Sequence, residues 1–453
     1  MNINTRVLSG FMELLPHEQI EFDKIKNIIE NTYKQFGFSS INTPNIERSQ
    51  ILLAKGSSET DKQLYFVNNG MIDEKTQSDI NELALRFDLT VPLSRYVAQH
   101  FSHLVFPFRC CHIGKVYRGE RPQKGRFREF YQCDIDIIGK DKLDICYEAE
   151  ILNIIYQIFK KLDIGKFTIR INNRKLLNGY FAIFGEKLTA SILQIIDKAE
   201  KISKDELLRL FSNIELSKNE IDYILSFINI KGSTKDIIKT LENLQVDNKM
   251  FQEGLTELTT VVNFIEKFKV SNSYYTIDLS IVRGLDYYTG TVYETTLDNH
   301  NIGSICSGGR YDNLASHYTK EKLPGVGVSI GLTRLFWQLK ENGLLKLNNS
   351  TYNIIVVTEN QKAIGYAIEV ADVLRKHNIN TDVFYEDVPM KKKFQYINKK
   401  EASISIVIKN DTDFNTISLQ YLNKDNDGYT KEIISLQGLP NKVKNLLCNF
   451  GGE

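Results

Sequence analysis

The segment HIGKVYRGERPQKGRFREFYQCDIDIIG, residues 112–139, determines how the fold and the chemistry of this chain are interpreted. Its pattern predicts two β-strands, residues 113–117 and 129–138, joined by a polar loop. A hairpin turn needs only about two to five residues, so this loop is longer than a turn requires. The loop is also basic, and its cations are Arg118, Arg121, Lys124, Arg126 and Arg128.

The arginines of this loop allow two interpretations. A run of cations is usually a solvated surface loop. Here, however, Glu120, Gln132 and Asp136 accompany the arginines in the loop and on the second strand. This combination favours a loop that clamps phosphate groups above a polar floor, because the planar guanidinium of arginine matches phosphate oxygens.

The composition is that of an ordinary globular chain, with 453 residues, 42% hydrophobic and 25% charged residues. At about 100–200 residues per domain, two or three domains are expected. The net charge of +1 means that any site for a polyanion must be a local patch. No apolar run reaches about 18 residues and the N-terminus lacks a secretion signal, so we expect no membrane span. Six cysteines without a C-x-x-C pair and seven histidines without ligand spacing predict a reduced, cytoplasmic protein without a metal site.

The N-terminal part predicts a helix at residues 18–36, because apolar residues recur there at steps of three and four. Further on, the segment LALRFDLTVP, residues 83–92, predicts a strand followed by a helix. Asp88, Leu89 and Thr90 stand at the junction. A helix cap is one interpretation of these residues. A site for an ammonium group is the other, because an ammonium group that leaves water needs a carboxylate.

Residues 187–268 are expected to be entirely helical, with Ser-x-x-Glu or Ser-x-x-Asp caps beginning at Ser203, Ser217 and Ser233. This part of the chain is therefore a candidate inserted helical bundle. Strands resume at Tyr274.

The segment IDLSIVRGLDYYTGTVYE, residues 277–294, places an arginine before a glycine and two tyrosines. An inward-facing Arg283 must meet an anion. Tyr287 and Tyr288 are predicted to lie on a strand and so to face opposite sides, with core packing as the alternative. In CSGGRYDNL, residues 306–314, the paired glycines allow a ligand to approach the backbone, and Tyr311 follows them.

The last part of the chain begins with a small-residue strand that runs into a helix containing Arg334, residues 324–339. After a linker, residues 352–453 alternate between strand and helix patterns. This alternation predicts a small α/β domain around a mixed sheet.

These segments, in this order, resemble motifs 1, 2 and 3 of the class II aminoacyl-tRNA synthetases. The R-x-E loop with its RP-Q-x-GR-x-R-x-F-x-Q run, together with R-G-L-D-Y-Y and G-G-R-Y-D, resembles the histidyl-tRNA synthetase family. The family often has an acidic residue where this chain has Thr333. The resemblance implies an α+β fold: a catalytic domain on an antiparallel sheet (1–341) that contains the helical insertion (187–268), a linker (342–351) and an α/β anticodon-binding-like domain (352–453).

The resemblance also implies an activity. Histidine and ATP, with Mg²⁺ expected alongside ATP, would give histidyl-adenylate, and histidine would then pass to the 3′ end of tRNA(His). A homodimer is implied as well. The alternative is a non-catalytic histidine-binding regulatory paralogue, although such relatives typically lack the C-terminal domain and part of the active-site set, which this chain keeps.

The resemblance implies a role for each matching residue. Reaction chemistry would fall to Arg283 and Arg118. Histidine would be bound by Asp88, Leu89, Thr90, Gln132, Asp136, Tyr287, Tyr288 and Tyr311. ATP would be bound by Arg118, Glu120, Phe130, Arg283 and Arg334. The acceptor end of tRNA would be met by Arg121, Gln123 and Arg126.

Overall fold

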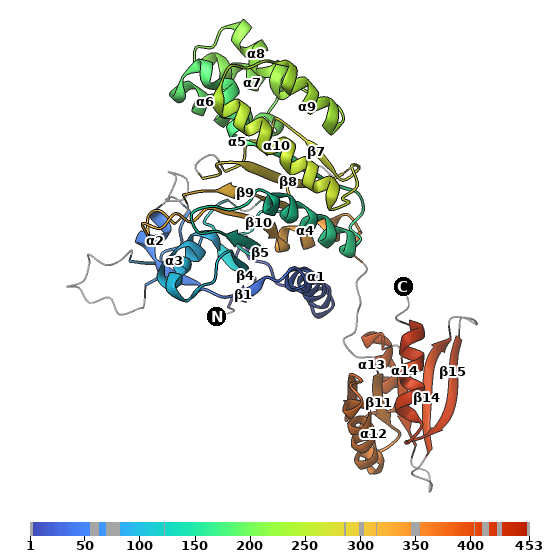
Figure 1. The fold of residues 1–453 in the computed structure, drawn as a ribbon. Helices are drawn as coiled ribbons and strands as arrows, with labels where there is room; N and C mark the ends of the chain where they lie inside the picture. Colours follow the sequence, from blue (N-terminus) through green and yellow to red (C-terminus); the bar gives the residue numbers. More distant parts are fainter. Residues whose placement is uncertain are drawn as a thin grey trace, which may run out of the picture. The chain divides into compact units, whose positions relative to one another are not determined.

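The computed structural model describes residues 3–54, 63–68, 82–121, 123–284, 287–298, 303–313, 315–345, 354–402, 404–409, 416–423 and 428–450. The chain divides into two compact units (Figure 1). The first unit comprises Met1–Glu13 and Lys24–Leu345, and the second comprises Leu14–Asp23 and Lys346–Glu453.

The first unit is built on an eight-stranded sheet in the order β1-β4-β5-β10-β9-β8-β6-β7. The strands in chain order are β1 (Ser39–Ile41), β4 (Phe108–Tyr117), β5 (Glu129–Ile138), β6 (Phe167–Asn173), β7 (Tyr275–Ile277), β8 (Thr291–Leu297), β9 (Cys306–Tyr311) and β10 (Gly325–Gly331). The six strands from β4 to β6 pair antiparallel, and β1 and β7 pair parallel at the two edges. The predicted antiparallel sheet and its long β4–β5 hairpin are therefore confirmed.

Helices and a small second sheet surround the large sheet. The helices are α1 (Pro16–Gln35), α2 (Ser49–Leu53), α3 (Thr90–His100), α4 (Cys146–Leu162) and α11 (Leu332–Glu341), and the small sheet pairs β2 (Ile46–Arg48) with β3 (Leu83–Leu85). Helix α4 packs on β6 and β10, and Tyr293 of β8 donates a 2.8 Å hydrogen bond to the Glu148 carbonyl of α4. Because side chains alternate along a strand, Glu294 faces away from α4.

Residues 187–268 are helical as predicted, and the helical segment begins earlier than expected, at Arg174. It contains α5 (Arg174–Phe181), α6 (Glu186–Ile196), α7 (Lys204–Asn213), α8 (Lys218–Ile228), α9 (Thr234–Asn243) and α10 (Lys249–Lys267). Ser203, Ser217 and Ser233 cap α7, α8 and α9 as predicted. Helices α5 and α10 cross closely because each presents a glycine, and a side chain at Gly179 or Gly254 would overlap the other helix.

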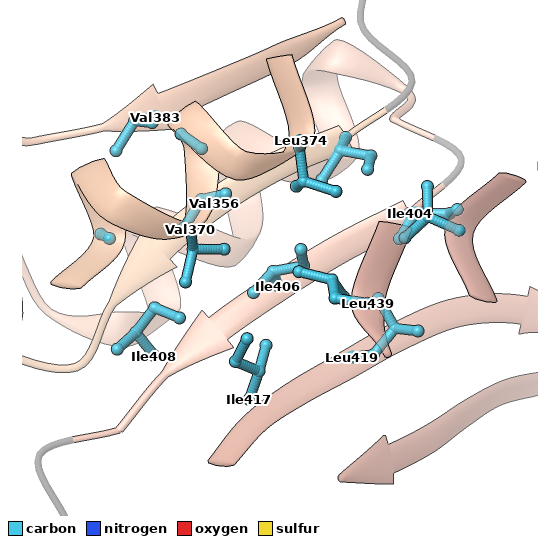
Figure 2. Packing of buried hydrophobic residues seen from close by; sticks show 14 of the residues in the cluster. Val356, Val370, Leu374, Val383, Ile404, Ile406, Ile408, Ile417, Leu419 and Leu439 are labelled. Atoms are coloured by element: carbon cyan, nitrogen blue, oxygen red, sulfur yellow. The ribbon is translucent and has the colours of Figure 1, made fainter. Parts of the chain in front are cut away.

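The second unit has a mixed five-stranded sheet, as predicted, in the order β12-β11-β13-β14-β15. Its elements are β11 (Ile354–Thr358), α12 (Ile364–Lys376), β12 (Thr381–Phe384), α13 (Met390–Lys400), β13 (Ile404–Ile408), β14 (Thr416–Asn423), β15 (Gly428–Ser435) and α14 (Leu439–Phe450). Figure 2 shows its apolar core, in which Val356 and Ile406 of the sheet pack with Leu374 and Leu439 of the helices.

Four short 3₁₀ turns complete the described structure: Phe101–His103, Ala182–Phe184, Ala199–Lys201 and Gln361–Ala363. None of the helices in the described ranges is long and apolar enough to cross a membrane.

Candidate active site

A continuous row of polar side chains crosses the large sheet on the face opposite α4. The strand register brings six residues into line, one from each of β4, β5, β10, β9, β8 and β6: His112, Asp134, Ser329, Ser307, Glu294 and Arg170. Residues directly opposite each other in antiparallel strands share a face of the sheet. Asp134 and Glu294 are both buried. Two short serine side chains lie between these carboxylates.

Asp136 lies in the neighbouring row, two residues along β5. The Tyr311 hydroxyl donates a 2.8 Å hydrogen bond to Asp136 Oδ1. Gly327 stands opposite Asp136, and a side chain at Gly327 would overlap the carboxylate. Burial raises the pKa of Asp136 to about 7, with the Tyr311 hydrogen bond lowering it and the charge of Asp88 raising it. The structure thus brings two of the predicted histidine-binding residues, Asp136 and Tyr311, into contact, and the Asp136 carboxylate is a buried hydrogen-bond acceptor.

The prediction that Tyr287 and Tyr288 lie on a strand and face opposite sides is wrong. Strand β8 begins only at Thr291, and the two rings stack with centroids 4.3 Å apart. The backbone turns at Gly284, where φ is +56°, and a side chain at Gly284 would overlap the Tyr288 ring. Tyr287 in turn stacks on Tyr311, with ring centroids 6.0 Å apart. The three tyrosines therefore form one aromatic group that leads to Asp136.

A cavity of about 770 Å³ lies beside these tyrosines, between the loop and the insertion. Tyr287 and Tyr288 line it together with Lys175 of α5 and Lys249 of α10. The cavity therefore borders the loop of Tyr287 and Tyr288 on the side of the helical insertion.

Asp88 caps α3, because its Oδ1 accepts a 2.9 Å hydrogen bond from the Val91 N–H. The cap interpretation is therefore confirmed for one carboxylate oxygen. Burial raises the pKa of Asp88, whereas the Val91 hydrogen bond and the charge of Arg118 lower it. The Leu89 side chain is buried in the core, so it can meet a ligand only through its backbone, and Thr90 begins the helix.

Arg118 is held between two phenyl rings. Its guanidinium lies 4.4 Å from the Phe87 ring centroid and 5.1 Å from that of Phe130, and its Nε donates to the Phe87 carbonyl at 3.2 Å. Burial lowers the pKa of Arg118, and the carboxylates of Asp88 and Glu120 oppose this shift. Arg118 and Phe130, each predicted to bind ATP, are thus in contact with one another.

Gln132 and Asp134 each present a buried oxygen without a hydrogen-bond partner among the residues that the structure describes: Gln132 Oε1 and Asp134 Oδ1. The amide nitrogen of Gln132 donates to Ser329 Oγ at 2.8 Å. Asp134 was missed from the sequence. The period of two along β5 could have found it, since Asp134 lies between Gln132 and Asp136 on the same face.

Arginines from three parts of the chain lie close enough to repel one another. Burial lowers the pKa of Arg334, and the charges of Arg126 and Arg283 lower it further. Arg334 donates to the Ser304 carbonyl at 3.2 Å, while its buried Nε has no partner within the described ranges. The charges of Arg126 and Arg283 thus converge on Arg334, and such a cluster of guanidinium groups suits a polyanion.

Arg283 forms an ion pair with Glu294. The second oxygen of Glu294 lies 3.3 Å from Arg170, which also pairs with Asp278 at 2.8 Å and with Glu200 of the insertion. An inward-facing Arg283 was expected to meet an anion. In the structure that anion is the carboxylate of Glu294.

Thr333, where the family often has an acid, supports the backbone of β5. Its Oγ1 accepts a 2.8 Å hydrogen bond from the Tyr131 N–H.

Arg121, Gln123 and Arg126 are exposed near the end of the β4–β5 loop. The Arg126 N–H donates to the Gln123 carbonyl at 2.9 Å, and Arg126 lies 3.5 Å from Glu120. Within the described ranges, no three His, Cys, Asp or Glu side chains are grouped to hold a metal ion.

Comparisons with known proteins relate both parts of the chain to known families. Residues 10–335 match the family model described as histidyl-tRNA synthetase, and residues 352–446 match that of the anticodon binding domain. A histidine–tRNA ligase of Clostridium tetani (strain Massachusetts / E88) is 53% identical over 411 residues, which cover 90% of this chain and 92% of that protein. The corresponding Finegoldia magna protein is 44% identical over 447 residues, covering 98% of this chain and 100% of that protein.

Among solved structures, histidyl-tRNA synthetase from Nostoc sp. PCC 7120 superposes with a TM-score of 0.87 at 35% identity, covering 98% of this chain and 100% of that one. The predicted class II fold and its C-terminal anticodon-binding domain are thereby confirmed. This chain belongs to the histidyl-tRNA synthetase family.

Proposed function

We propose that this protein activates L-histidine with ATP, giving histidyl-adenylate and pyrophosphate, and then transfers histidine to the 3′ end of tRNA(His). One observation carries the proposal. On one side of the site a buried acceptor, Asp136 with Tyr311, is available for an imidazole N–H, and on the other side the charges of Arg126 and Arg283 act on the guanidinium of Arg334. The substrates of this reaction, an imidazole amino acid and a triphosphate, match these two features.

The specificity for histidine rests on Asp136. A buried acceptor that needs a ring N–H rejects amino acids without one, because their binding would leave the acceptor unpaired. Tyr287 and Tyr288 would enclose the ring beside Tyr311. Asp88, Thr90 and Gln132 would hold the α-amino group, with Leu89 contributing through its backbone.

ATP would lie along the arginines. Phe130 would stack under the adenine, Glu120 would accept from its amino group, and Arg118 would hold the α-phosphate. Arg334 would meet the γ-phosphate, and Mg²⁺ would arrive with the nucleotide. Arg283 would bridge the histidine carboxylate and the α-phosphate, where it can stabilise the charge that develops in the transition state.

The exposed Arg121, Gln123 and Arg126 would meet the acceptor end of tRNA. The C-terminal unit, whose sequence matches an anticodon-binding model, would bind the anticodon arm. We further propose that the protein works as a cytoplasmic homodimer.

The decisive test is histidine-dependent exchange of pyrophosphate into ATP, with the other amino acids as controls. Exchange with histidine alone is the expected result. Histidine binding without exchange would instead favour the non-catalytic regulatory paralogue.

A further inference from the structure

Asp134 is a buried carboxylate on the site face to which the family resemblance gives no role. It lies between Gln132 and Asp136 on β5, and only 3% of its surface is exposed. Its Oδ1 has no hydrogen-bond partner in the described part of the chain. Glu294, in the same row of the sheet, is instead held by two arginines. Glu294 therefore forms ion pairs with arginines of the protein, whereas Asp134, in the same row, has an oxygen without a partner in the described structure.

The charges around Asp134 favour a cationic ligand. Burial raises the pKa of Asp134 well above its usual range, the Ser329 hydroxyl lowers it, and the charges of Asp136 and Asp88 raise it. Arg118 is the cation that lowers it, and Arg118 also compensates Asp88. Several carboxylates therefore share one guanidinium, and a buried carboxylate is costly unless it is paired.

Arg86 is the other buried cation nearby, behind Gly114, and the charge of Asp134 raises its pKa against the lowering by burial. The hydrogen bonds of Arg86, however, go to other groups. Arg86 Nε donates to the Lys115 carbonyl at 2.8 Å, and Nη1 donates to the Thr43 carbonyl at 2.7 Å. Arg86 therefore bonds to Lys115, Thr43 and His112, and Asp134 Oδ1 has no partner among the described residues.

The number of N–H donors on histidine indicates which of its groups Asp134 would bind. The imidazole N–H is already matched to Asp136. The α-ammonium group has three N–H donors, whereas Asp88 has given one oxygen to the cap of α3. On strand β5, Gln132 Oε1 and Asp134 Oδ1 are buried acceptors without partners among the residues that the structure describes, and Ser329 stands opposite Asp134 and binds the Gln132 amide.

Resting on the proposed function, we propose that Asp134 is a specificity-determining residue that accepts a hydrogen bond from the α-ammonium group of histidine beside Gln132. Asp134 thereby selects the cationic amino acid over imidazole acids without an amino group.

The experiment compares three ligands on Asp134→Asn and, as a matched control on the same face of β5, Asp136→Asn. L-Histidine and L-histidinol both carry the ammonium group, and 3-(imidazol-4-yl)propionate lacks it. Dissociation constants come from calorimetry or from inhibition of pyrophosphate exchange. Asp134→Asn should weaken histidine and histidinol by about 10- to 100-fold, the usual range for a hydrogen bond to a charged group. It should leave imidazolepropionate within about threefold, whereas Asp136→Asn should weaken all three ligands.

An equal loss for all three ligands in Asp134→Asn would show a merely structural role, and unchanged histidinol binding would remove the role altogether. A second measurement covers folding. Replacing a buried carboxyl group of which one oxygen has no partner in the described structure should leave the unliganded protein at least as resistant to heat as the wild type. If the variant instead unfolds, Asp134→Ser is put through the same three ligands. Wild-type exchange with histidine tests the proposed function separately, so the two ideas can fail independently.

Discussion

Asp88, Asp134 and Asp136 show how neighbours decide what identical side chains can do. Asp88 gives one oxygen to a helix cap, Asp136 accepts from a tyrosine, and Asp134 keeps an unpaired oxygen in the described structure. Burial raises the pKa of each. A cationic, ring-bearing substrate would satisfy all three carboxylates at once, so their local differences point to one ligand.

Replacing Arg283 should impair the first chemical step. We expect Arg283→Ala to lower the rate of adenylate formation by about 100-fold or more, as when one oxyanion donor is lost. The measurement is single-turnover formation of histidyl-adenylate. Arg283→Lys is the control, because it keeps the charge but not the two-sided geometry of a guanidinium. Near-normal turnover in Arg283→Ala would show that the assigned role is wrong.

The raised pKa of Asp136 predicts how stability depends on pH. The usual pKa of an aspartate is 3.8. At pH values between 3.8 and about 7, Asp136 therefore holds a proton in the folded protein that it has lost in the unfolded chain. The stability that this proton provides is therefore complete at acidic pH and is lost as the pH rises through about 7. Between pH 5 and 7, the wild type should lose about 2 kcal/mol relative to Asp136→Asn.

Denaturant unfolding of the unliganded wild type and Asp136→Asn across this pH range checks the prediction. Parallel curves for the two proteins would contradict it, and above pH 8 their difference should be constant.

At the scale of elements, the sequence predicted those strands and helices whose positions follow from the periodicity of apolar residues. The β4–β5 hairpin and the capped helices of the insertion follow from local patterns, and the structure confirms them. The turn of the Tyr287–Tyr288 loop did not follow, because it depends on a positive φ at Gly284 and on packing against a distant strand.

The polar row across the large sheet could not be predicted from the sequence either. It depends on the register of six strands, several of them far apart in the chain, which fixes Asp134 and Glu294 on one face. The roles assigned to the individual site residues remain predictions, because contacts with substrates are what would test them.

Glu294 of strand β8 should affect the rate of adenylate formation, because it positions Arg283. Glu294→Gln removes the charge that holds Arg283, so we expect the rate of adenylate formation to fall by about 10- to 100-fold, the cost of a small misplacement. Affinities for histidine and ATP should change little. Asp278→Asn is the matched control, because it removes another carboxylate of Arg170 without touching Arg283. Equal defects in the two variants would assign the effect to Arg170 and the fold.

At the scale of the whole molecule, the candidate site lies within one unit. The site residues from Asp88 to Arg334 all belong to the first unit, and the two family models match separate parts of the chain. The second unit has its own sheet and its own apolar core (Figure 2). Amino-acid activation and tRNA binding can therefore be separated experimentally.

A chain ending at Leu345 should keep the first half-reaction and lose most of the second. We expect histidine-dependent pyrophosphate exchange within about tenfold of the full chain. Charging of tRNA at low tRNA concentration should fall by about 100-fold or more, because the contribution of a second linked binding site is lost. Both activities are measured on the same preparations, with circular dichroism to verify folding.

Adding residues 346–453 as a separate chain is the control, and it should restore little charging, since the gain from linkage depends on the covalent connection. A folded fragment without exchange would mean that the activation site requires residues 346–453. Full charging by the fragment would mean that residues 346–453 contribute no binding energy for tRNA. Loss of charging alone would place the two recognition events on different units, as their separate cores allow.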